Sequence, residues 1–432
     1  MPERRLTNWL NTTSPFCFAC YAMAASFSTY FCMYAFRKPF AAGIYASEDE
    51  LFGMPFKTAY VISQIIGYAT SKFIGIRVCS EVSDRRRAVL LIGLIVWALA
   101  ALLLFAVLPP KLKIVAMFLN GLPLGMVWGL VVRYLEGRQL SELLLASLSC
   151  SYILSSGIVK DVGRAWMSQG VPEVWMPAVT GFCFLPIFVL AVWLLNQLPR
   201  PTDADVASRV ERPVMKGHDR RAFFGQFWLG LVMLLSAYFL FTAYRDYRDN
   251  YGINVFQAMG YAEEPAIFTK TEIPVAMGVM TALALLNLIR NHRHGLIATF
   301  AVMVFGLSLM LGSTLALDAG WLKGHELWWM VLVGLGAYLA YVPFGTALFE
   351  RLIASTRVKG NAVFSIYLSD TVGYSGSIIV QLTKEWGGFT GSYFEFFHDL
   401  TYVVAGFGIL MVVLSGVYFL PKTRPTNEPV AT

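Results

Sequence analysis

The feature that most constrains this chain is a succession of long apolar stretches that runs through its whole length. A segment needs about 20 predominantly apolar residues to cross a bilayer as a helix. Each stretch is predicted to form one helix, because a helix satisfies its own backbone hydrogen bonds in lipid. The twelve predicted spans are Pro15–Tyr45, Lys57–Cys79, Ala88–Leu108, Ile114–Val132, Leu143–Trp166, Trp175–Leu198, Phe223–Tyr244, Glu272–Ile289, Leu296–Leu317, Leu327–Leu348, Asn361–Leu382 and Leu400–Leu420.

The composition agrees with an integral membrane protein and excludes several other classes. Hydrophobic residues make up 57% of the chain, charged residues make up 14%, and the mean hydropathy is +0.59. Soluble domains carry about 25% charged residues, so a soluble protein with one large core is excluded. Disordered chains, collagens, coiled coils and disulfide scaffolds need other biases. The net charge of +7 is attributed to cytoplasmic Lys and Arg, so no nucleic-acid partner is predicted.

A polar segment near the middle of the chain divides the spans into two groups of six. Residues 199–221 are rich in charge and proline, and they are predicted to form a cytoplasmic linker. The predicted domains are therefore an N-terminal six-helix half over 1–198 and a C-terminal six-helix half over 222–432. Lys and Arg are enriched in the loops on the side of both termini, which predicts that both termini are cytoplasmic.

A short internal repeat relates the two predicted halves. The sequence from Ser28 to Arg37 is STYFCMYAFR, and the sequence from Ser236 to Arg245 is SAYFLFTAYR. Five of the ten positions are identical, including the final arginine, and the offset of 208 residues is close to half the chain. Two six-helix halves related by an axis along the membrane normal are typical of the major facilitator architecture. The predicted fold class is therefore an all-α integral membrane protein with twelve transmembrane helices in two pseudo-symmetric halves.

Two arginines of this repeat fall in or beside apolar spans. An arginine inside a span costs several kcal/mol unless it faces a polar cavity or a partner. Arg37 is interpreted as a functional residue because Arg245 duplicates it, whereas the adjacent Lys38 is interpreted as an interfacial residue whose amine reaches water. Arg245 begins the polar run RDYRDNYG, so a surface pair with Asp246 or Asp249 remains the alternative for it.

The second predicted span carries a polar face. Tyr60, Gln64, Tyr68 and Lys72 recur at four-residue spacing, which keeps them on one side of a helix. Such a face is expected to line a cavity rather than lipid. Together with the two arginines, Lys72 predicts an anionic ligand, because arginine binds phosphate or carboxylate through two parallel hydrogen bonds and lysine acts as a point charge.

Few acidic residues are predicted to lie inside the membrane. Asp161 and Asp370 are the two candidates, and each either pairs with a nearby cation or carries a coupling proton. Pairing is favoured, because an unpaired carboxylate is costly at low dielectric. For Asp161 the candidate partners are Lys160 and Arg164. The positions of Cys and His predict neither a metal site nor a cofactor.

These motifs resemble the organophosphate:phosphate antiporter branch of the major facilitator superfamily, which includes glycerol-3-phosphate and hexose-phosphate carriers. The first span holds the tyrosine-rich stretch YFCMYAFRK from Tyr30 to Lys38. The residues that match the branch in the second, fourth and seventh spans are Tyr68, Ser71, Lys72 and Phe73, then Gly121, Gly125, Met126, Trp128 and Arg133, and finally Arg245. The two glycines of the fourth span are also predicted to allow close helix packing.

The resemblance implies roles for several residues. Arg37 and Arg245 would hold the substrate phosphate, and Lys72 would support them. The branch has a histidine in its fifth helix, and Tyr152 stands at that position here, which marks the chain as a divergent member. Tyr34, Gln64 and Tyr68 complete the predicted substrate-binding set.

The function predicted from the sequence is secondary transport, not enzyme catalysis. The substrate is a phosphorylated or phosphonate organic anion, moved across a bacterial inner membrane by a monomer in exchange for inorganic phosphate. The alternatives are a proton-coupled carboxylate symporter that uses Asp370 or Asp161, and a transporter-like membrane sensor of an organophosphate. No enzymatic motif supports a membrane enzyme.

Overall fold

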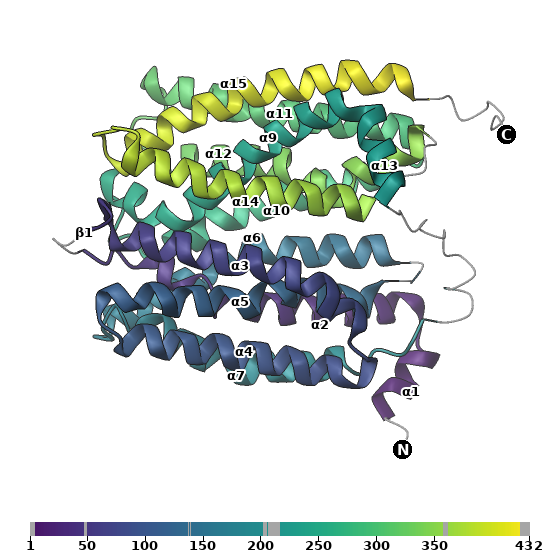
Figure 1. Cartoon of the computed structure of the whole chain (residues 1–432), viewed down its shortest axis with the longest axis horizontal. Coiled ribbons are helices and arrows are strands. Elements are labelled where there is room, and N and C mark those ends of the chain that lie inside the picture. Colours follow the sequence, from purple (N-terminus) through teal and green to yellow (C-terminus); the bar gives the residue numbers. More distant parts are fainter. Residues whose placement is uncertain are drawn as a thin grey trace. The chain divides into compact units, whose positions relative to one another are not determined.

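A computed structural model of the chain describes residues 5–46, 50–136, 138, 140–201, 205, 217–356 and 362–423. Twelve helices in these ranges have 20 or more residues (Figure 1). They are α2 (Pro15–Tyr34), α3 (Phe56–Glu81), α4 (Asp84–Val107), α5 (Pro110–Leu135), α6 (Ser141–Ser168), α7 (Met176–Leu195), α9 (Gly217–Ala258), α10 (Ile267–Asn287), α11 (His292–Asp318), α12 (Glu326–Thr346), α14 (Ala362–Trp386) and α15 (Tyr393–Phe419).

The remaining elements are short. They are the helices α1 (Arg5–Thr12), η1 (Pro39–Ala42), α13 (Leu348–Thr356) and η2 (Leu420–Lys422), and the strands β1 (Glu50–Leu51) and β2 (Met54–Pro55). The two strands pair antiparallel and are the only strands among the described residues.

Ten of the long helices in the described residues are both long enough and apolar enough to cross a membrane. The two that fall outside this set are α3 and α14. Both carry polar side chains along their length, among them Gln64 and Lys72 in α3 and Asp370 and Gln381 in α14. Polar side chains on a long helix of a membrane protein are expected to face the protein interior or a cavity.

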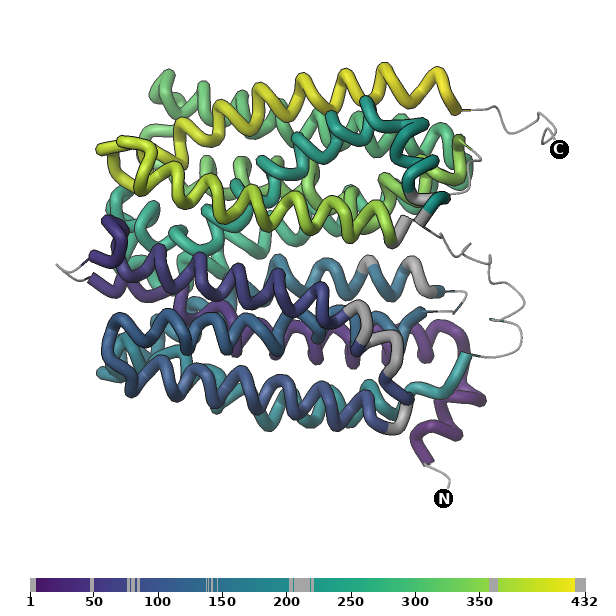
Figure 2. The backbone as a smooth tube through the Cα atoms, in the orientation of Figure 1, coloured from purple at the N-terminus to yellow at the C-terminus, as the bar shows by residue number. Residues whose placement is uncertain are grey.

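The chain divides into two compact units. Unit 1 comprises residues 1–210, 250–257 and 261–270, and unit 2 comprises residues 211–249, 258–260 and 271–432. The first 33 residues of α9 thus belong to unit 2, and Asn250–Gln257 at its C-terminal end belongs to unit 1. Figure 2 shows α3, α4 and α5 of unit 1 running side by side.

The first predicted span is wrong as a single helix. Helix α2 ends at Tyr34, and residues 35–38 form a turn that leads into the 3-10 helix η1. Pro39 explains this, because proline donates no backbone hydrogen bond and its ring would clash with the carbonyl of Ala35 if the α-helix continued. The N–H groups of Ala35, Phe36 and Arg37 each bond to the carbonyl three residues earlier, which tightens the helix end. Arg37 consequently lies in a turn.

The predicted end of the seventh span is also wrong. The sequence placed it at Tyr244, but α9 continues without interruption to Ala258 and begins at Gly217, inside the predicted linker. Residues 202–204 and 206–216 of that linker lie outside the described residues. At about 63 Å, a helix of 42 residues is longer than the hydrocarbon core of a bilayer. Arg245 therefore lies within a helix.

Helices α3 and α5 pack closely in unit 1, as predicted from Gly121 and Gly125. A Cβ atom on Gly121 would lie 2.3 Å from the carbonyl oxygen of Gln64, and one on Gly125 would lie 2.6 Å from that of Tyr68. A Cβ on Gly67 of α3 would likewise lie 2.3 Å from the carbonyl oxygen of Phe118. The predicted close approach is confirmed, and it fixes the backbone positions of Gln64 and Tyr68.

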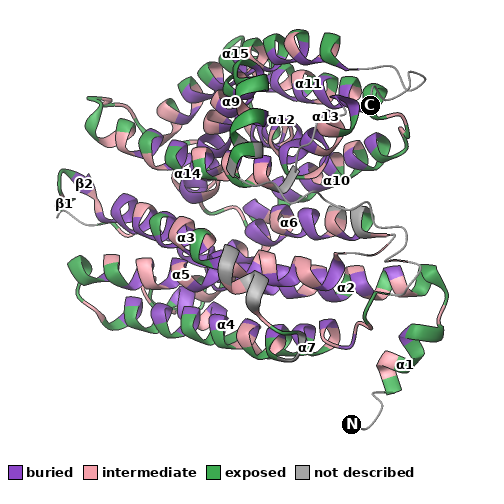
Figure 3. Cartoon of the chain, turned by 45° about the vertical axis from the view of Figure 1, so that its right-hand side comes forward, coloured by how far each residue is buried: buried purple, intermediate pink, exposed green. Residues whose placement is uncertain are grey.

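In unit 2, glycines likewise allow α9 and α14 to pack closely. A Cβ on Gly376 would lie 2.4 Å from the carbonyl oxygen of Phe239, and one on Gly373 would lie 2.5 Å from Oγ1 of Thr242. Large apolar side chains are exposed on α4, such as Val89 and Trp97, and on α7, such as Phe182. Figure 3 shows exposed residues in green along both helices. Exposed apolar surface of this kind suits contact with lipid.

Candidate functional site: a cation cluster in unit 1

Two cations lie over one tyrosine ring in unit 1. The guanidinium carbon of Arg37 is 3.9 Å from the centroid of the Tyr68 ring, and Nζ of Lys72 is 5.7 Å from the same centroid. Arg37 is 5% exposed and Tyr68 is 3% exposed. Two like charges near one ring repel each other, and a bound anion would relieve that repulsion. We call Arg37, Tyr68 and Lys72 the cation cluster.

An amide pair holds the turn that carries Arg37. Nε2 of Gln64 donates hydrogen bonds to the carbonyl oxygen of Arg37 at 3.2 Å and to Oδ1 of Asn120 at 2.7 Å. Nδ2 of Asn120 donates to the carbonyl oxygens of Phe36 at 3.0 Å and Ala98 at 3.1 Å. Both amides are buried, so these bonds are shielded from competition with water. The pair therefore orients Arg37 through its backbone.

Aromatic side chains extend from the cluster. The rings of Tyr30 and Tyr34 meet edge to face at 5.6 Å, and Tyr30 also meets the ring of Trp128 at 4.9 Å. Trp128 in turn lies 6.3 Å from Tyr152 of α6. Direct contacts thus join four of the substrate-binding residues predicted in the first six helices, namely Arg37, Gln64, Tyr68 and Lys72. Tyr34 and Tyr152 belong to the adjoining aromatic set.

Unit 1 buries further cations. Its buried charged residues, among those whose burial is described, are Arg37, Lys38, Lys57, Arg87, Lys113 and Lys160, and they include no carboxylate. Lys38 is 3% exposed and donates to Oδ1 of Asn250 at 2.9 Å. The prediction that its amine reaches water is therefore wrong. Lys57 similarly donates to Oδ1 of Asn254 at 2.6 Å, and Lys113 donates to the carbonyl oxygen of Phe105 at 2.5 Å.

Arg245, the repeat partner of Arg37, has a different environment in unit 2. Its guanidinium carbon lies 4.3 Å from the Tyr341 ring centroid, which parallels the contact of Arg37 with Tyr68. It also forms an ion pair with Asp246 at 2.6 Å, and the second oxygen of Asp246 accepts a hydrogen bond from Ser377 at 2.6 Å. Asp246 is 2% exposed, so this pair is not at the surface. The predicted partner is present, but it lies inside unit 2.

The two predicted acids occupy different settings. Asp161 forms an ion pair with Arg164 at 3.7 Å and accepts hydrogen bonds from the backbone N–H groups of Phe268 at 3.3 Å and Thr269 at 2.6 Å. It thus caps the first turn of α10, where the helix dipole favours a negative charge. Asp370 lies in α14 and accepts a hydrogen bond from the Tyr238 hydroxyl at 3.0 Å.

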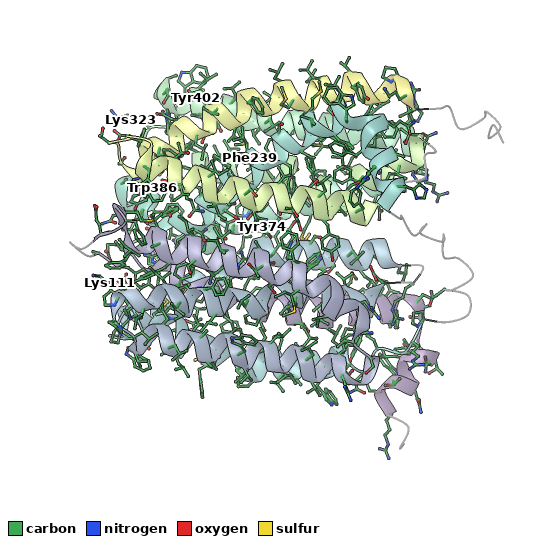
Figure 4. The ribbon with its side chains drawn as sticks, in the orientation of Figure 1. Lys111, Phe239, Lys323, Tyr374, Trp386 and Tyr402 are labelled. Carbon is green, nitrogen blue, oxygen red and sulfur yellow. The ribbon has the colours of Figure 1, made fainter. Side chains whose placement is uncertain are left out.

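A cavity in unit 2 contains none of the predicted site residues. It encloses about 750 Å³ where the end of α11 meets the connection from α14 to α15. His398 lines it and contacts Asp318 at 2.8 Å, and the Tyr402 hydroxyl donates to the same aspartate at 2.5 Å. Figure 4 labels Tyr402 with Lys323 and Trp386 at one end of unit 2, and Phe239 and Tyr374 nearer the middle. Within the described ranges no group of three or more His, Cys, Asp or Glu could hold a metal ion.

The sequence analysis did not identify three residues that form buried hydrogen bonds or ion pairs in the two units. Asn120 was one polar residue in an apolar span, and its position directly before Gly121 was the available signal. Glu272 was placed at the edge of a span, but it is 5% exposed and forms an ion pair with Arg248. Asn250 lay in a polar run that was interpreted as the end of a helix.

Comparison with known proteins defines the family and the fold. The chain belongs to the family described as "Family of unknown function (DUF5690)", whose sequence profile matches residues 39–422. A search of curated proteins finds no match.

Solved structures of transporters share the fold over nearly the whole chain. A D-xylose–proton symporter has a TM-score of 0.63 at 12% identity, with 95% of this chain and 99% of that chain covered. A peptide transporter solved in complex with alafosfalin has a TM-score of 0.61 at 14% identity, covering 98% and 100% of the two chains. The nucleoside transporter NupG has a TM-score of 0.59 at 11% identity, covering 93% and 99%. The chain therefore has the major facilitator fold that these transporters share, and its long apolar helices are those of a multi-pass membrane protein.

Proposed function

We propose that this protein is a secondary transporter of a phosphorylated or phosphonate organic anion, which it exchanges for inorganic phosphate. The observation that carries the proposal is the placement of Arg37 and Lys72 over the Tyr68 ring in a unit that buries several cations. Arginine matches the geometry of a phosphoryl group, and a nearby lysine adds charge without directional demands. The motif resemblance to organophosphate:phosphate antiporters supports the same substrate class.

The exchange mechanism follows from the cost of burying like charges. An empty site with clustered cations resists closure at low dielectric, because the repulsion between like charges grows as water leaves. A bound anion offsets that cost, so closure and reorientation are favoured only when the site is loaded. Inorganic phosphate, as the smallest ligand with the required group, is the proposed counter-substrate. Rocking of repeats around a central site is the general mechanism of such carriers.

Residue roles in the proposal follow from the contacts. Arg37 binds the anionic group, Lys72 adds charge, and Tyr68 holds both cations. Gln64 is a positioning residue, because it bonds to the backbone of Arg37 rather than presenting its own amide. Tyr34 and Tyr152 are assigned to the organic part of the substrate through their place in the aromatic set. Arg245 is proposed as a second, weaker contact, since Asp246 offsets its charge.

The proposal includes a cellular setting. The location is a bacterial inner membrane, with both termini cytoplasmic and the protein acting as a monomer. The distribution of Lys and Arg among the loops supports the orientation.

One observation favours a second candidate, a proton-coupled symporter of a carboxylate. Asp370 is a partly buried acid in α14 whose carboxylate accepts a hydrogen bond from Tyr238. Uptake driven by an imposed pH gradient into anion-free vesicles, and lost in Asp370→Asn, would favour this function. Asp161 is less suited to carry a proton, because an arginine and two backbone N–H groups already stabilise its charge.

The test is counter-exchange in proteoliposomes. Vesicles loaded with unlabelled phosphate are expected to take up labelled phosphate and at least one organophosphate, chosen by a thermal-shift screen of phosphorylated and phosphonate metabolites. Phosphate-free vesicles are expected to take up much less. Equal uptake with and without internal phosphate would reject exchange.

Variants of the cation cluster test the site itself. Arg37→Lys and Lys72→Ala are expected to lower the exchange rate by about tenfold or more, the order of one charge-assisted hydrogen bond. The matched control is Lys113→Met, which removes a buried cation of the same unit held by backbone carbonyls. Unchanged exchange in Arg37→Lys would remove Arg37 from the site.

A further inference from the structure

Basic side chains gather at one end of unit 2, where α10 ends, α11 begins and η2 follows α15. Five of them are exposed there, namely Arg290, His292, Arg293, His294 and Lys422. The segments that supply them, 285–297 and 410–423, contain no acidic residue. Because the apolar helices α11 and α15 reach this end, its positive charge lies beside surface that suits contact with lipid.

Hydrogen bonds fix the backbone that carries these side chains. The guanidinium of Arg351 in α13 donates to two backbone carbonyl oxygens at the end of α10, at 2.8 Å and 3.0 Å. The side chain of Asn291 accepts hydrogen bonds from the backbone N–H groups of Arg293 at 3.0 Å and His294 at 3.1 Å, and thereby caps α11. The basic side chains at this junction therefore project from a backbone that is held in place.

Two of these cations lie together where α11 meets the end of α15. Nε of Arg293 donates a hydrogen bond to Oγ1 of Thr423 at 2.9 Å, and Thr423 directly follows Lys422. Nζ of Lys422 lies 4.0 Å from the ring centroid of Tyr418. Neither cation pairs with a carboxylate in the part of the chain that the structure describes. The edge formed by the two Nη groups of Arg293 thus remains to bind two oxygens of a phosphate.

An exposed apolar stripe runs along α15 from the same end. One face of α15 packs on α11, where a Cβ on Gly416 would lie 3.7 Å from the Phe300 ring. Another face exposes four apolar side chains at spacings of three and four residues, which keep them on one side of the helix. They are Phe407, Leu410, Leu414 and Val417. From its first to its last residue the stripe extends about 15 Å, which is half of the roughly 30 Å hydrocarbon core and matches the acyl chains of one leaflet.

We propose that this surface of unit 2 binds an anionic phospholipid, with the lipid phosphate at Arg293 and Lys422 and an acyl chain along the stripe from Phe407 to Val417. A free anion would use only the two cations, and a second copy of the chain would use only the stripe. An anionic lipid uses both, because its charge lies at the membrane surface and its acyl chains lie directly below. The inference goes beyond the proposed function, since it involves neither the cation cluster of unit 1 nor phosphate exchange.

The test measures the affinity of the purified full-length protein for two lipids in a neutral detergent. Phosphatidylglycerol and phosphatidylcholine with identical acyl chains are titrated, and bound lipid is counted by native mass spectrometry. Wild type is expected to prefer phosphatidylglycerol by at least about tenfold, as two basic residues near a headgroup account for. Arg293→Gln/Lys422→Gln is expected to lose this preference. The charge-matched control Lys111→Gln/Lys323→Gln, at two exposed lysines away from this end (Figure 4), is expected to keep it.

The stripe provides the second arm of the test. Leu410→Gln/Leu414→Gln is expected to weaken the binding of both lipids, because the acyl chain loses its apolar contact.

Three results would overturn the proposal. One is an equal lipid preference in Arg293→Gln/Lys422→Gln and its control. Another is displacement of the lipid by inorganic phosphate together with unchanged binding in the stripe variant, which would indicate a site for free anions. The third is a dimer in wild type that the stripe variant abolishes, which would assign the stripe to a second copy of the chain. Loss of phosphate exchange with the lipid preference intact would reject only the proposed function.

Discussion

Unit 1 buries six Lys and Arg side chains and no carboxylate among the residues whose burial is described, whereas unit 2 buries Arg248 together with Asp246 and Glu272. The acceptors described for the cations of unit 1 include amide oxygens, backbone carbonyls and aromatic rings. In unit 2, Arg245 and Arg248 instead form ion pairs with Asp246 and Glu272.

This difference assigns different tasks to the units. A cation held by neutral dipoles keeps a net charge that attracts an anion, whereas a cation in an ion pair is offset locally. Unit 1 is therefore the proposed source of anion attraction. Unit 2 is proposed to contribute less to anion attraction, because ion pairs offset the charges of Arg245 and Arg248. The sequence repeat that contains Arg37 and Arg245 does not show this difference, because the acid Asp246 lies just after the repeat and follows only Arg245.

The largest expected effect on stability comes from removing one partner of a buried ion pair, compared with removing a buried cation that has no acidic partner. Arg248→Met leaves Glu272 as a buried carboxylate without its partner, which costs about 3–5 kcal/mol of unfolding free energy. Lys113→Met leaves only backbone carbonyls without a donor and is expected to cost about 1–3 kcal/mol. Thermal unfolding of both variants in one detergent measures the difference.

A further readout sharpens that comparison. The double variant Arg248→Met/Glu272→Leu is expected to recover most of the lost stability, because neither charge of the pair remains buried. A deficit that the double variant does not rescue would contradict the ion-pair interpretation.

An intermediate effect is expected where α3 and α5 meet. Gly121→Ala places a Cβ 2.3 Å from the backbone oxygen of Gln64, so one helix must shift, at a cost of about 1–3 kcal/mol. The shift also displaces the amide that holds the Arg37 turn, so the phosphate exchange rate is expected to fall. Gly93→Ala in α4 is the control, because nothing lies within 4 Å of the added Cβ. Equal stability and equal exchange rates in the two variants would show that close packing at Gly121 does not position Gln64.

The smallest effect is expected at the cap of α10. Asp161→Asn keeps the shape of the side chain but removes its charge from the helix N-terminus and from Arg164, which costs about 1 kcal/mol. Asp399→Asn, at a side chain that is 69% exposed, is expected to leave stability unchanged. The midpoint of thermal unfolding distinguishes the two. A loss in Asp161→Asn no greater than that in Asp399→Asn would show that the cap contributes nothing.

The sequence predicted the class of fold because hydropathy alone identifies helices that cross lipid. It predicted their ends poorly where a local signal competes with hydropathy. In the first span, Pro39 ends the helix early although apolar residues continue beyond it. In α9, a polar run suggested a helix end, but partner side chains satisfy those polar groups and the helix continues to Ala258.

The candidate site was predictable only in part for a related reason. Tyr68 and Lys72 follow from helical spacing within one segment, so a sequence pattern reveals them. The partners Gln64 and Asn120 lie 56 residues apart, and Arg248 and Glu272 lie 24 residues apart. No periodicity records such contacts, because tertiary packing creates them.

The most direct test of the different tasks of the two units is the affinity of the purified protein for labelled phosphate. Arg37→Gln is expected to weaken binding by at least about tenfold, equivalent to about 1.4 kcal/mol. The double variant Arg245→Gln/Asp246→Asn, which removes the whole ion pair, is expected to remain within about threefold of wild type, since a factor of three is less than 1 kcal/mol. Wild-type affinity in Arg37→Gln, or an equal loss in both variants, would contradict the account.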